Sequence, residues 1–271
     1  MKNVLLICLL IITVYTLTAG KLHWDKRVIA VQAGSAATND VNHQDKKEKE
    51  VISAAEVIDK DKLVKLDKVN HLPPELQQKF REKINGDDQP VYMMVLGSSS
   101  TSQKEGGWPK QLENKLHEFY GKSLVEVSIK EIANKTSDQV ISENIHKDLA
   151  GLTPDILLLE PFLLYDNGEL SISDRLQNLS TIIEVFKEHN PEMTVMIQPA
   201  NPIHGARHYP NEEQDLEDYA KQNKYIYLNH WYAWPDHKGK EIKEYLTNEN
   251  LPNDKGNGLW AKYLIDYFVR K

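Results

Sequence analysis

Cysteine is almost absent from the sequence, which excludes several classes of protein. The single cysteine among the 271 residues is Cys8, and it lies inside an apolar stretch near the N-terminus. A disulfide framework needs cysteine pairs, and the cysteine-rich kinds of zinc site need at least two. The histidine and aspartate spacing, as in "HWYAWPDH", also lacks the close helical pairing of a zinc site. We therefore expect no disulfide, no metal and no cofactor.

An excess of positive charge is also missing. The chain has 33 lysines and arginines against 40 aspartates and glutamates, which gives a formal net charge of −7. Nucleic-acid binding depends on basic residues that neutralise phosphates. The charge balance gives no support for a nucleic-acid partner, and we expect none.

One long hydrophobic run is present, at the N-terminus. After Lys2, residues 4–17 are almost wholly apolar, and residues 18–20 are small. The run fits the apolar region of a cleaved signal peptide, and with the small residues it approaches the roughly 17 residues that span a bilayer. Trp24 and its charged neighbours favour an uncleaved anchor. Residues 1–27 are thus predicted to be a signal peptide or a membrane anchor, which places the rest on the extracellular face of the membrane or, after cleavage, outside the cell.

Two further segments precede the main domain. Residues 28–50 contain few large apolar residues, which predicts a flexible tether. In residues 51–85 apolar residues return at helical spacing, and Pro73 and Pro74 open a second helix, which predicts a helical lead-in. The main domain is expected to occupy residues 86–271.

In this main domain short apolar strands alternate with amphipathic helices. The expected strands lie at residues 91–96, 124–129, 154–162, 193–199 and 225–231, and the expected helices at 108–121, 137–149, 173–189, 211–222, 240–246 and 254–269. This alternation predicts an α/β fold, a three-layer α/β/α flavodoxin-like arrangement with a five-stranded parallel sheet. Ligands of such folds bind outside the carboxyl ends of the strands.

Hydroxyl, amide and imidazole side chains follow the predicted strands at these ends. They are Gly97 to Ser100, Ala133 to Thr136, Tyr165 to Asn167, Asn201 with His204, and Asn229 to Trp231. Such a set suits acyl transfer, in which an imidazole activates a serine and N–H groups hold the oxyanion.

Two of these stretches resemble the SGNH/GDSL hydrolase family. "VLGSSST" is similar to the nucleophile block, a strand followed by Gly-Asp-Ser, with Ser98 in the place of the Asp and Ser99 in the place of the nucleophile. "IANKTS" is similar to the second block, whose backbone N–H contributes to the oxyanion hole, and Asn134 holds that place. The resemblance implies that Ser99 is the nucleophile and that Asn134 is an oxyanion donor.

The later blocks of the family are also present in altered form. "PDILLLEPFLLYDNG" resembles the third block, with Tyr165 in the place of its Asn and Asn167 as a substitute. "NENLPNDKG" resembles the final block, Asp-x-x-His-Pro-Asn-x-x-Gly, but Asn248 and Leu251 occupy the Asp and His places. The resemblance covers roughly residues 90–270 and implies the SGNH fold.

With leucine in the usual place of the histidine, the base has to come from elsewhere. His230 lies at the end of the fifth predicted strand, and we interpret it as a relocated base that Asp236 orients. His204 and His208 are competing bases, and Asp254 is a competing orienting acid.

The same rim is rich in aromatic side chains. Trp231 and Trp234, with Asn167 and His204, are expected to bind substrate, because aromatic faces stack on sugar rings; core packing is the alternative for the two tryptophans. The resemblance, above all to secreted or membrane-tethered members from Gram-positive bacteria, implies a serine esterase or acyltransferase that acts on acyl esters, such as acetyl esters, of cell-envelope polysaccharide. The alternative is an inactive SGNH-fold protein that binds cell-wall glycan.

Overall fold

The computed structural model describes residues 60–86 and 89–270, which belong to one compact unit. The predicted signal peptide or anchor, the tether and the first part of the lead-in lie outside these residues. Within the described part, none of the helices has both the length and the apolar character required to cross a membrane.

The core of this unit is a parallel sheet of five strands. They are β1 (Val91–Gly97), β2 (Val125–Glu131), β3 (Ile156–Leu159), β4 (Thr194–Ile197) and β5 (Ile226–Tyr227). Their order is β2-β1-β3-β4-β5, and every neighbouring pair is parallel. The direction of winding therefore reverses between β1 and β3, which is where ligands of doubly wound sheets bind.

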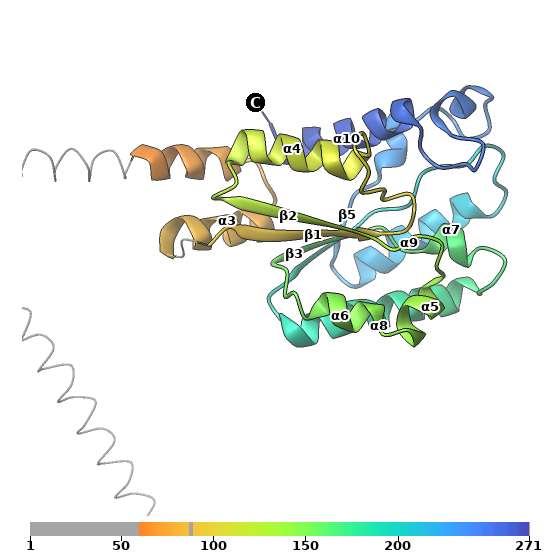
Figure 1. Cartoon of the computed structure of the whole chain (residues 1–271), viewed down its shortest axis with the longest axis horizontal. Coiled ribbons are helices and arrows are strands. Elements are labelled where there is room, and N and C mark those ends of the chain that lie inside the picture. Colours follow the sequence, from red (N-terminus) through yellow and green to blue (C-terminus); the bar gives the residue numbers. More distant parts are fainter. Residues whose placement is uncertain (1–59, 87–88, 271) are drawn as a thin grey trace, which may run out of the picture. The chain divides into compact units, whose positions relative to one another are not determined.

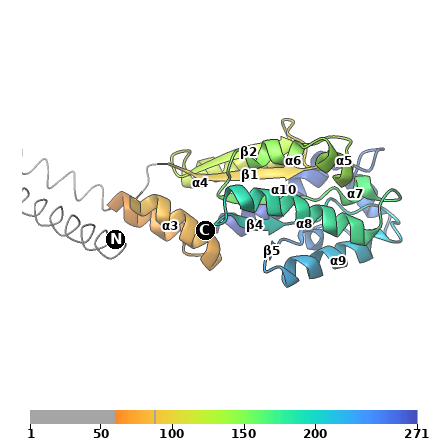
Figure 2. The same ribbon diagram turned by 90° about the horizontal axis from the view of Figure 1, so that it is seen from below.

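Helices cover both faces of the sheet. They are α3 (Pro74–Gly86), α4 (Trp108–Tyr120), α5 (Ser137–Ser142), α6 (Ile145–Ala150), α7 (Leu163–Asp166), α8 (Ile172–His189), α9 (Tyr209–Gln222) and α10 (Asp254–Phe268). Figure 1 shows α4 and α10 on one face and α5, α6 and α8 on the other. In Figure 2 α8 lies between α6 and α9. The predicted three-layer α/β/α fold with five parallel strands is confirmed.

Two predicted helices differ in detail from the structure. The helix expected at residues 137–149 is split into α5 and α6, because Asn144 between them has a left-handed backbone with φ of 59°. The helix expected at residues 240–246 is a 3₁₀ helix, Glu241–Tyr245. A second 3₁₀ helix, His230–Ala233, follows β5.

The lead-in contributes to the core of the described unit. Residues 60–69 are helical, and α3 follows after a short turn. Val69, Leu76 and Phe80 are at most 1% exposed and join the cluster under α4 and α10. The ring of Phe80 lies 5.0 Å from that of Tyr120, between centroids. The lead-in thus buries apolar surface against the α/β fold, which stabilises both.

Candidate active site

The turn after β1 holds the three consecutive serines. Strand β1 ends at Gly97, and the N–H of Thr101 donates to the carbonyl of Ser98 at 2.9 Å. Gly97 is required here, since a Cβ on it would lie 2.2 Å from Thr101 Oγ1. Ser98 and Ser100 are buried and Ser99 is half-buried; Ser99 and Ser100 both line a cleft, but the hydroxyl of Ser100 is engaged with Asn201. Ser99 is therefore the serine of this turn that a substrate in the cleft can reach.

The cleft lies at the carboxyl end of the sheet and has a volume of about 510 Å³. Its walls are the turn after β1, the loops 102–107 and 131–134, the loop 247–252 and the first turns of α10. Its position follows from the topology, because β1 is the strand at which the winding direction reverses.

Asn134 faces Ser99 across this cleft. The backbone N–H of Asn134 donates to Ser99 Oγ at 3.2 Å, and Asn134 has a left-handed backbone with φ of 57°. An N–H group beside a nucleophile can hold the negative oxygen of a tetrahedral intermediate. The structure thus brings together the two residues that the sequence pairs as nucleophile and oxyanion donor; their catalytic roles stay predictions.

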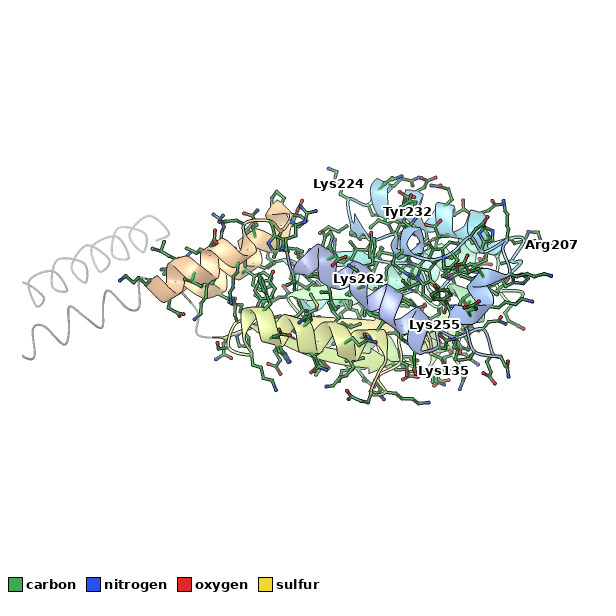
Figure 3. The ribbon with its side chains drawn as sticks, turned by 90° about the horizontal axis from the view of Figure 1, so that it is seen from above. Lys135, Arg207, Lys224, Tyr232, Lys255 and Lys262 are labelled. Carbon is green, nitrogen blue, oxygen red and sulfur yellow. The ribbon has the colours of Figure 1, made fainter. Side chains whose placement is uncertain are left out.

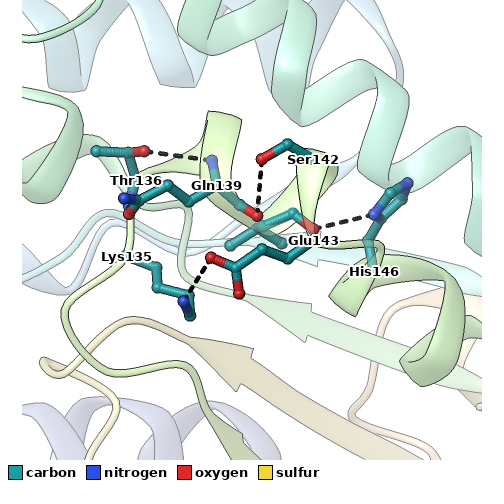
Figure 4. A network of polar contacts seen from close by, with 7 residues as sticks. Lys135, Thr136, Gln139, Ser142, Glu143 and His146 are labelled. Atoms are coloured by element: carbon teal, nitrogen blue, oxygen red, sulfur yellow. Dashed lines mark hydrogen bonds and ion pairs between the residues drawn. The ribbon is translucent and has the colours of Figure 1, made fainter.

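The position of Asn134 is fixed by the residues that follow it. Thr136 caps α5: its Oγ1 accepts from the Gln139 N–H at 3.3 Å, and Gln139 Oε1 accepts from the Thr136 N–H at 3.1 Å (Figure 4). Lys135 Nζ lies 2.7 Å from Glu143 Oε1. A reciprocal cap of this kind fixes the entry of the chain into the helix. The backbone N–H of Asn134 is therefore held in place by the capped first turn of α5, two residues further on.

A buried carboxylate lies beneath the serine turn. Glu160, the residue after β3, is fully buried, and its Oε2 accepts from the Ser98 N–H at 2.7 Å, from Ser98 Oγ at 2.8 Å and from Thr101 Oγ1 at 2.9 Å. Burial raises the pKa of Glu160 to about 8, although the hydrogen bonds from Ser98 and Thr101 oppose this shift. Glu160 was not among the predicted site residues, although its sequence offers one signal, an acidic residue at the end of an apolar strand.

Asn201 joins the serine turn to the loop that carries the final block. Ser100 Oγ donates to Asn201 Oδ1 at 2.9 Å, and Asn201 Nδ2 donates to the carbonyl of Asn250 at 2.9 Å. The loop is closed by the N–H of Thr247, which donates to the carbonyl of Leu251 at 2.7 Å. Leu251, in the usual place of the histidine, lines the cleft.

His230 is a core residue. It is 0% exposed, its Nε2 lies 2.9 Å from the carbonyl of Pro199, and its Nδ1 accepts from Trp234 Nε1 at 3.0 Å. Its ring stacks on Trp260, with the centroids 3.9 Å apart. Both nitrogens are engaged and the ring does not line the cleft of Ser99. These contacts oppose the expectation that His230 is the base, because a base needs a free nitrogen within reach of the serine.

The acid expected to orient His230 is also elsewhere. The side chain of Asp236 is 70% exposed, its Oδ1 accepts from the Lys238 N–H at 2.9 Å, and it lies 3.5 Å from His237 Nδ1. The competing acid, Asp254, is the first residue of α10 and lines the cleft.

The four residues expected to bind substrate do not line the cleft of Ser99. Trp234 is buried against His230, and Trp231 Nε1 donates to the carbonyl of Ala200 at 2.7 Å. For these two tryptophans the structure favours the core-packing alternative. Asn167 is exposed after α7, and His204 is half-buried in the loop after β4. The exposed aromatic of this segment is Tyr232, with 82% of its surface accessible (Figure 3).

Replacing His230 with alanine is expected to lower stability and leave the reactivity of Ser99 unchanged. The variant would leave a cavity beside Trp260 and remove the partners of Trp234 Nε1 and the Pro199 carbonyl, at a cost of about 2–4 kcal/mol. Urea unfolding checks the stability, and the rate of reaction with a fluorophosphonate checks the serine. A loss of reactivity in fully folded His230→Ala would restore His230 as the base.

Acid is expected to destabilise the protein through the same residue. Burial lowers the pKa of His230 from its ordinary value of 6.5 to about 3. Between these values the unfolded chain binds a proton that the folded chain excludes, so stability is full above pH 6.5 and falls as the pH drops toward 3. One such proton corresponds to roughly 1.4 kcal/mol per pH unit. Urea midpoints from pH 7 to 4 should therefore fall more steeply for the wild type than for His230→Gln, and parallel slopes would contradict this account.

The titratable residues that line the cleft are mostly acidic. They are Lys104, Glu105, Glu131, Glu249 and Asp254. A histidine is not among the lining residues of this cleft. In residues 60–86 and 89–270, no group of three or more histidine, cysteine or acidic residues is arranged to hold a metal ion.

Comparison with solved structures identifies the fold as that of GDSL-type lipases and esterases. A lipolytic protein of the G-D-S-L family from Desulfitobacterium hafniense is 19% identical, with 64% of this chain and 97% of that chain covered and a TM-score of 0.53. A carbohydrate esterase of family 3 from Talaromyces cellulolyticus is 13% identical, with 64% and 94% covered and a TM-score of 0.53. An acetyl-xylooligosaccharide esterase from Geobacillus is 14% identical, with 68% and 98% covered and a TM-score of 0.51. No family model matches the sequence, and a search of curated proteins found no relative.

Proposed function

We propose that this chain is a serine esterase that cleaves acyl esters, with Ser99 as its nucleophile. The observation that carries the proposal is the 3.2 Å contact between Ser99 Oγ and the Asn134 N–H in a cleft at the carboxyl end of β1. A reachable serine hydroxyl and an N–H donor beside it are two of the parts that acyl transfer uses; the third is a group that accepts the serine proton. The fold, shared with GDSL-type lipases and esterases, supports the same reaction class.

The reaction would proceed through an acyl-enzyme. Ser99 Oγ forms a bond to the ester carbonyl carbon, and the carbonyl electron pair moves to the oxygen, which the N–H groups of Ser99 and Asn134 hold. The serine proton passes to a carboxylate of the cleft, and the candidates are Glu249 and Asp254, which line the cleft and lie in the final block. The intermediate then expels the alcohol, which takes up the proton. Water finally releases the acid.

We propose an acetylated polysaccharide of the cell envelope as the substrate. Two solved structures of this fold carry names that refer to carbohydrate esters, one of them to an acetyl ester. The N-terminal hydrophobic run supports a location outside the membrane, where such polymers occur. The chain would then act on the extracellular face, held by the N-terminal segment or released by its cleavage.

A second candidate function is glycan binding without catalysis. It is favoured by Leu251, which lines the cleft in the place where the resembled family has its histidine. A leucine neither accepts a proton nor polarises a hydroxyl. Acetate release from acetylated xylan, with deacetylated xylan in a parallel binding titration, separates the two functions. Release that Ser99→Ala abolishes supports the esterase, and binding without release supports the alternative.

A further inference from the structure

Glu160 is a buried acid for which the proposed reaction has no direct use. It is 0% exposed and does not line the cleft. Burying a carboxyl group is costly whether it stays ionised or has to take up a proton, and a glutamine of the same size would avoid that cost. Its hydrogen-bond partners therefore indicate what the carboxylate does.

Its hydrogen-bond donors come from the turn that carries Ser99. The Ser98 N–H, Ser98 Oγ and Thr101 Oγ1 all donate to Glu160 Oε2, at 2.7 to 2.9 Å, and Ser98 Oγ also lies 3.1 Å from Oε1. Ser98 Oγ in turn accepts from the Ser100 N–H at 3.2 Å. The carboxylate thus binds the residues before and after Ser99, and through Ser98 it also orders the next peptide group.

The backbone at Gly97 allows the carboxyl group of Glu160 to lie close to the serine turn. A Cβ on Gly97 would lie 2.6 Å from Glu160 Oε2 and 2.8 Å from Thr101 Cβ, so the glycine makes room for the carboxylate against the chain. Strand β3 brings Glu160 to this place, because Leu96 and Leu159 pair in register and the Glu160 N–H donates to the Leu96 carbonyl at 2.8 Å. The side chain of Glu160 is therefore placed by the pairing of β1 with β3.

Ser98 stands where the nucleophile block of the resembled family has its aspartate. An aspartate at this position would place a second carboxyl group against Glu160, because Ser98 Oγ is already 2.8 Å from Oε2. Two carboxyl groups at that distance cannot both be ionised, and one of them would have to stay protonated. The serine at 98 and the glutamate at 160 are therefore complementary.

We propose that Glu160 is a positioning residue that holds the Ser98–Thr101 turn, and with it the Ser99 hydroxyl against the Asn134 N–H, in place of an acidic residue in the turn itself. The inference rests on the proposed function for its catalytic consequence. Its structural part, the ordering of the turn by Glu160, is measurable whether or not the chain is an esterase.

The test compares Glu160→Gln with Glu213→Gln. Glutamine keeps the shape of Glu160, but it replaces one carboxyl oxygen with an NH₂ group and offers Ser98 and Thr101 a single neutral acceptor oxygen, which binds donors more weakly than a carboxylate does. Glu213 is a matched control. It lies on α9, away from the serine turn, and it is buried and accepts hydrogen bonds from Tyr227 Oη and Asn229 Nδ2. Both variants are first checked for cooperative unfolding.

Hydrogen exchange gives the readout that does not depend on activity. In Glu160→Gln, peptides that contain residues 97–103 should exchange at least about tenfold faster than in the wild type, because the Ser98 N–H has only a neutral amide as acceptor and the Ser98 hydroxyl, which accepts from the Ser100 N–H, is held less firmly. Glu213→Gln should leave these peptides unchanged. Wild-type exchange of this turn in folded Glu160→Gln would overturn the proposal.

Labelling kinetics test the catalytic consequence. The fluorophosphonate reaction of Ser99 should slow by about 10- to 100-fold in Glu160→Gln, and ester hydrolysis should lose kcat with KM little changed. The double variant Ser98→Asp/Glu160→Gln should recover much of the loss, because it moves the carboxylate into the turn. If the double variant reacts no faster than Glu160→Gln, the claim that Glu160 takes the place of an acidic residue at position 98 is overturned. A wild type that does not label would refute the proposed function, and the exchange result alone would then decide the role of Glu160.

Discussion

Alanine in place of Ser99 is expected to remove ester hydrolysis, by at least about 10³-fold in kcat/KM for a small activated ester such as p-nitrophenyl acetate. Ser99 is the serine of the turn that both reaches the cleft and accepts an N–H bond from Asn134. Its neighbours Ser98 and Ser100 are buried and bound to Glu160 and Asn201, so they cannot replace it. Steady-state hydrolysis checks the prediction.

Ser102→Ala is the matched control for this experiment. Ser102 lines the same cleft and is half-buried like Ser99, but it lies beyond the turn. Its replacement is expected to change hydrolysis by less than about threefold. Equal rates for wild type and folded Ser99→Ala would contradict the assignment, because the hydrolysis would then arise from another group or from a contaminant.

Aspartate at 248 together with histidine at 251 is expected to raise hydrolysis by about 10²- to 10⁴-fold, the usual contribution of a positioned general base. Leu251 already lines the cleft, and its loop is closed on Thr247 and tied to Asn201 through the Asn250 carbonyl. The imidazole would therefore project into the cleft that contains Ser99. Because histidine titrates near pH 6.5, the gained activity should rise with pH through that region.

Two variants control for effects other than a new base. Leu251→Gln places a polar side chain of similar size in the cleft without a group that titrates near neutral pH, and it should give no gain. Leu251→His alone should gain less than the double variant, since the imidazole would lack an acid to orient it. A folded double variant with wild-type activity and an unchanged pH profile would show that the Ser99 cleft is not arranged as an esterase site.

The layered fold was predictable because its signals are local. The strands β1 and β3 read as apolar runs since both faces of a parallel sheet are covered, and helices such as α4 carry one apolar face. The packing of the lead-in against the core was harder to predict from the sequence. Phe80 is buried against Tyr120 across 40 positions of sequence, a contact that no local pattern reports.

The residues of the candidate site were predictable where their positions depend only on the path of the backbone. Ser99 and Asn134 meet because each follows one of two neighbouring parallel strands, β1 and β2. His230 also follows a strand, but the direction of its side chain depends on the Pro199 carbonyl and the Trp234 indole, which are tertiary partners. Glu160 was missed because its role appears only once the serine turn is placed on top of β3.

The most direct test of the account is the mass of the intact protein after reaction with a fluorophosphonate, followed by peptide sequencing to locate the adduct. The account predicts one adduct per chain, on Ser99, because this hydroxyl is reachable in the cleft and stands beside the Asn134 N–H. A folded protein that gains no mass, or that carries the adduct on another residue, would contradict it and favour the glycan-binding alternative.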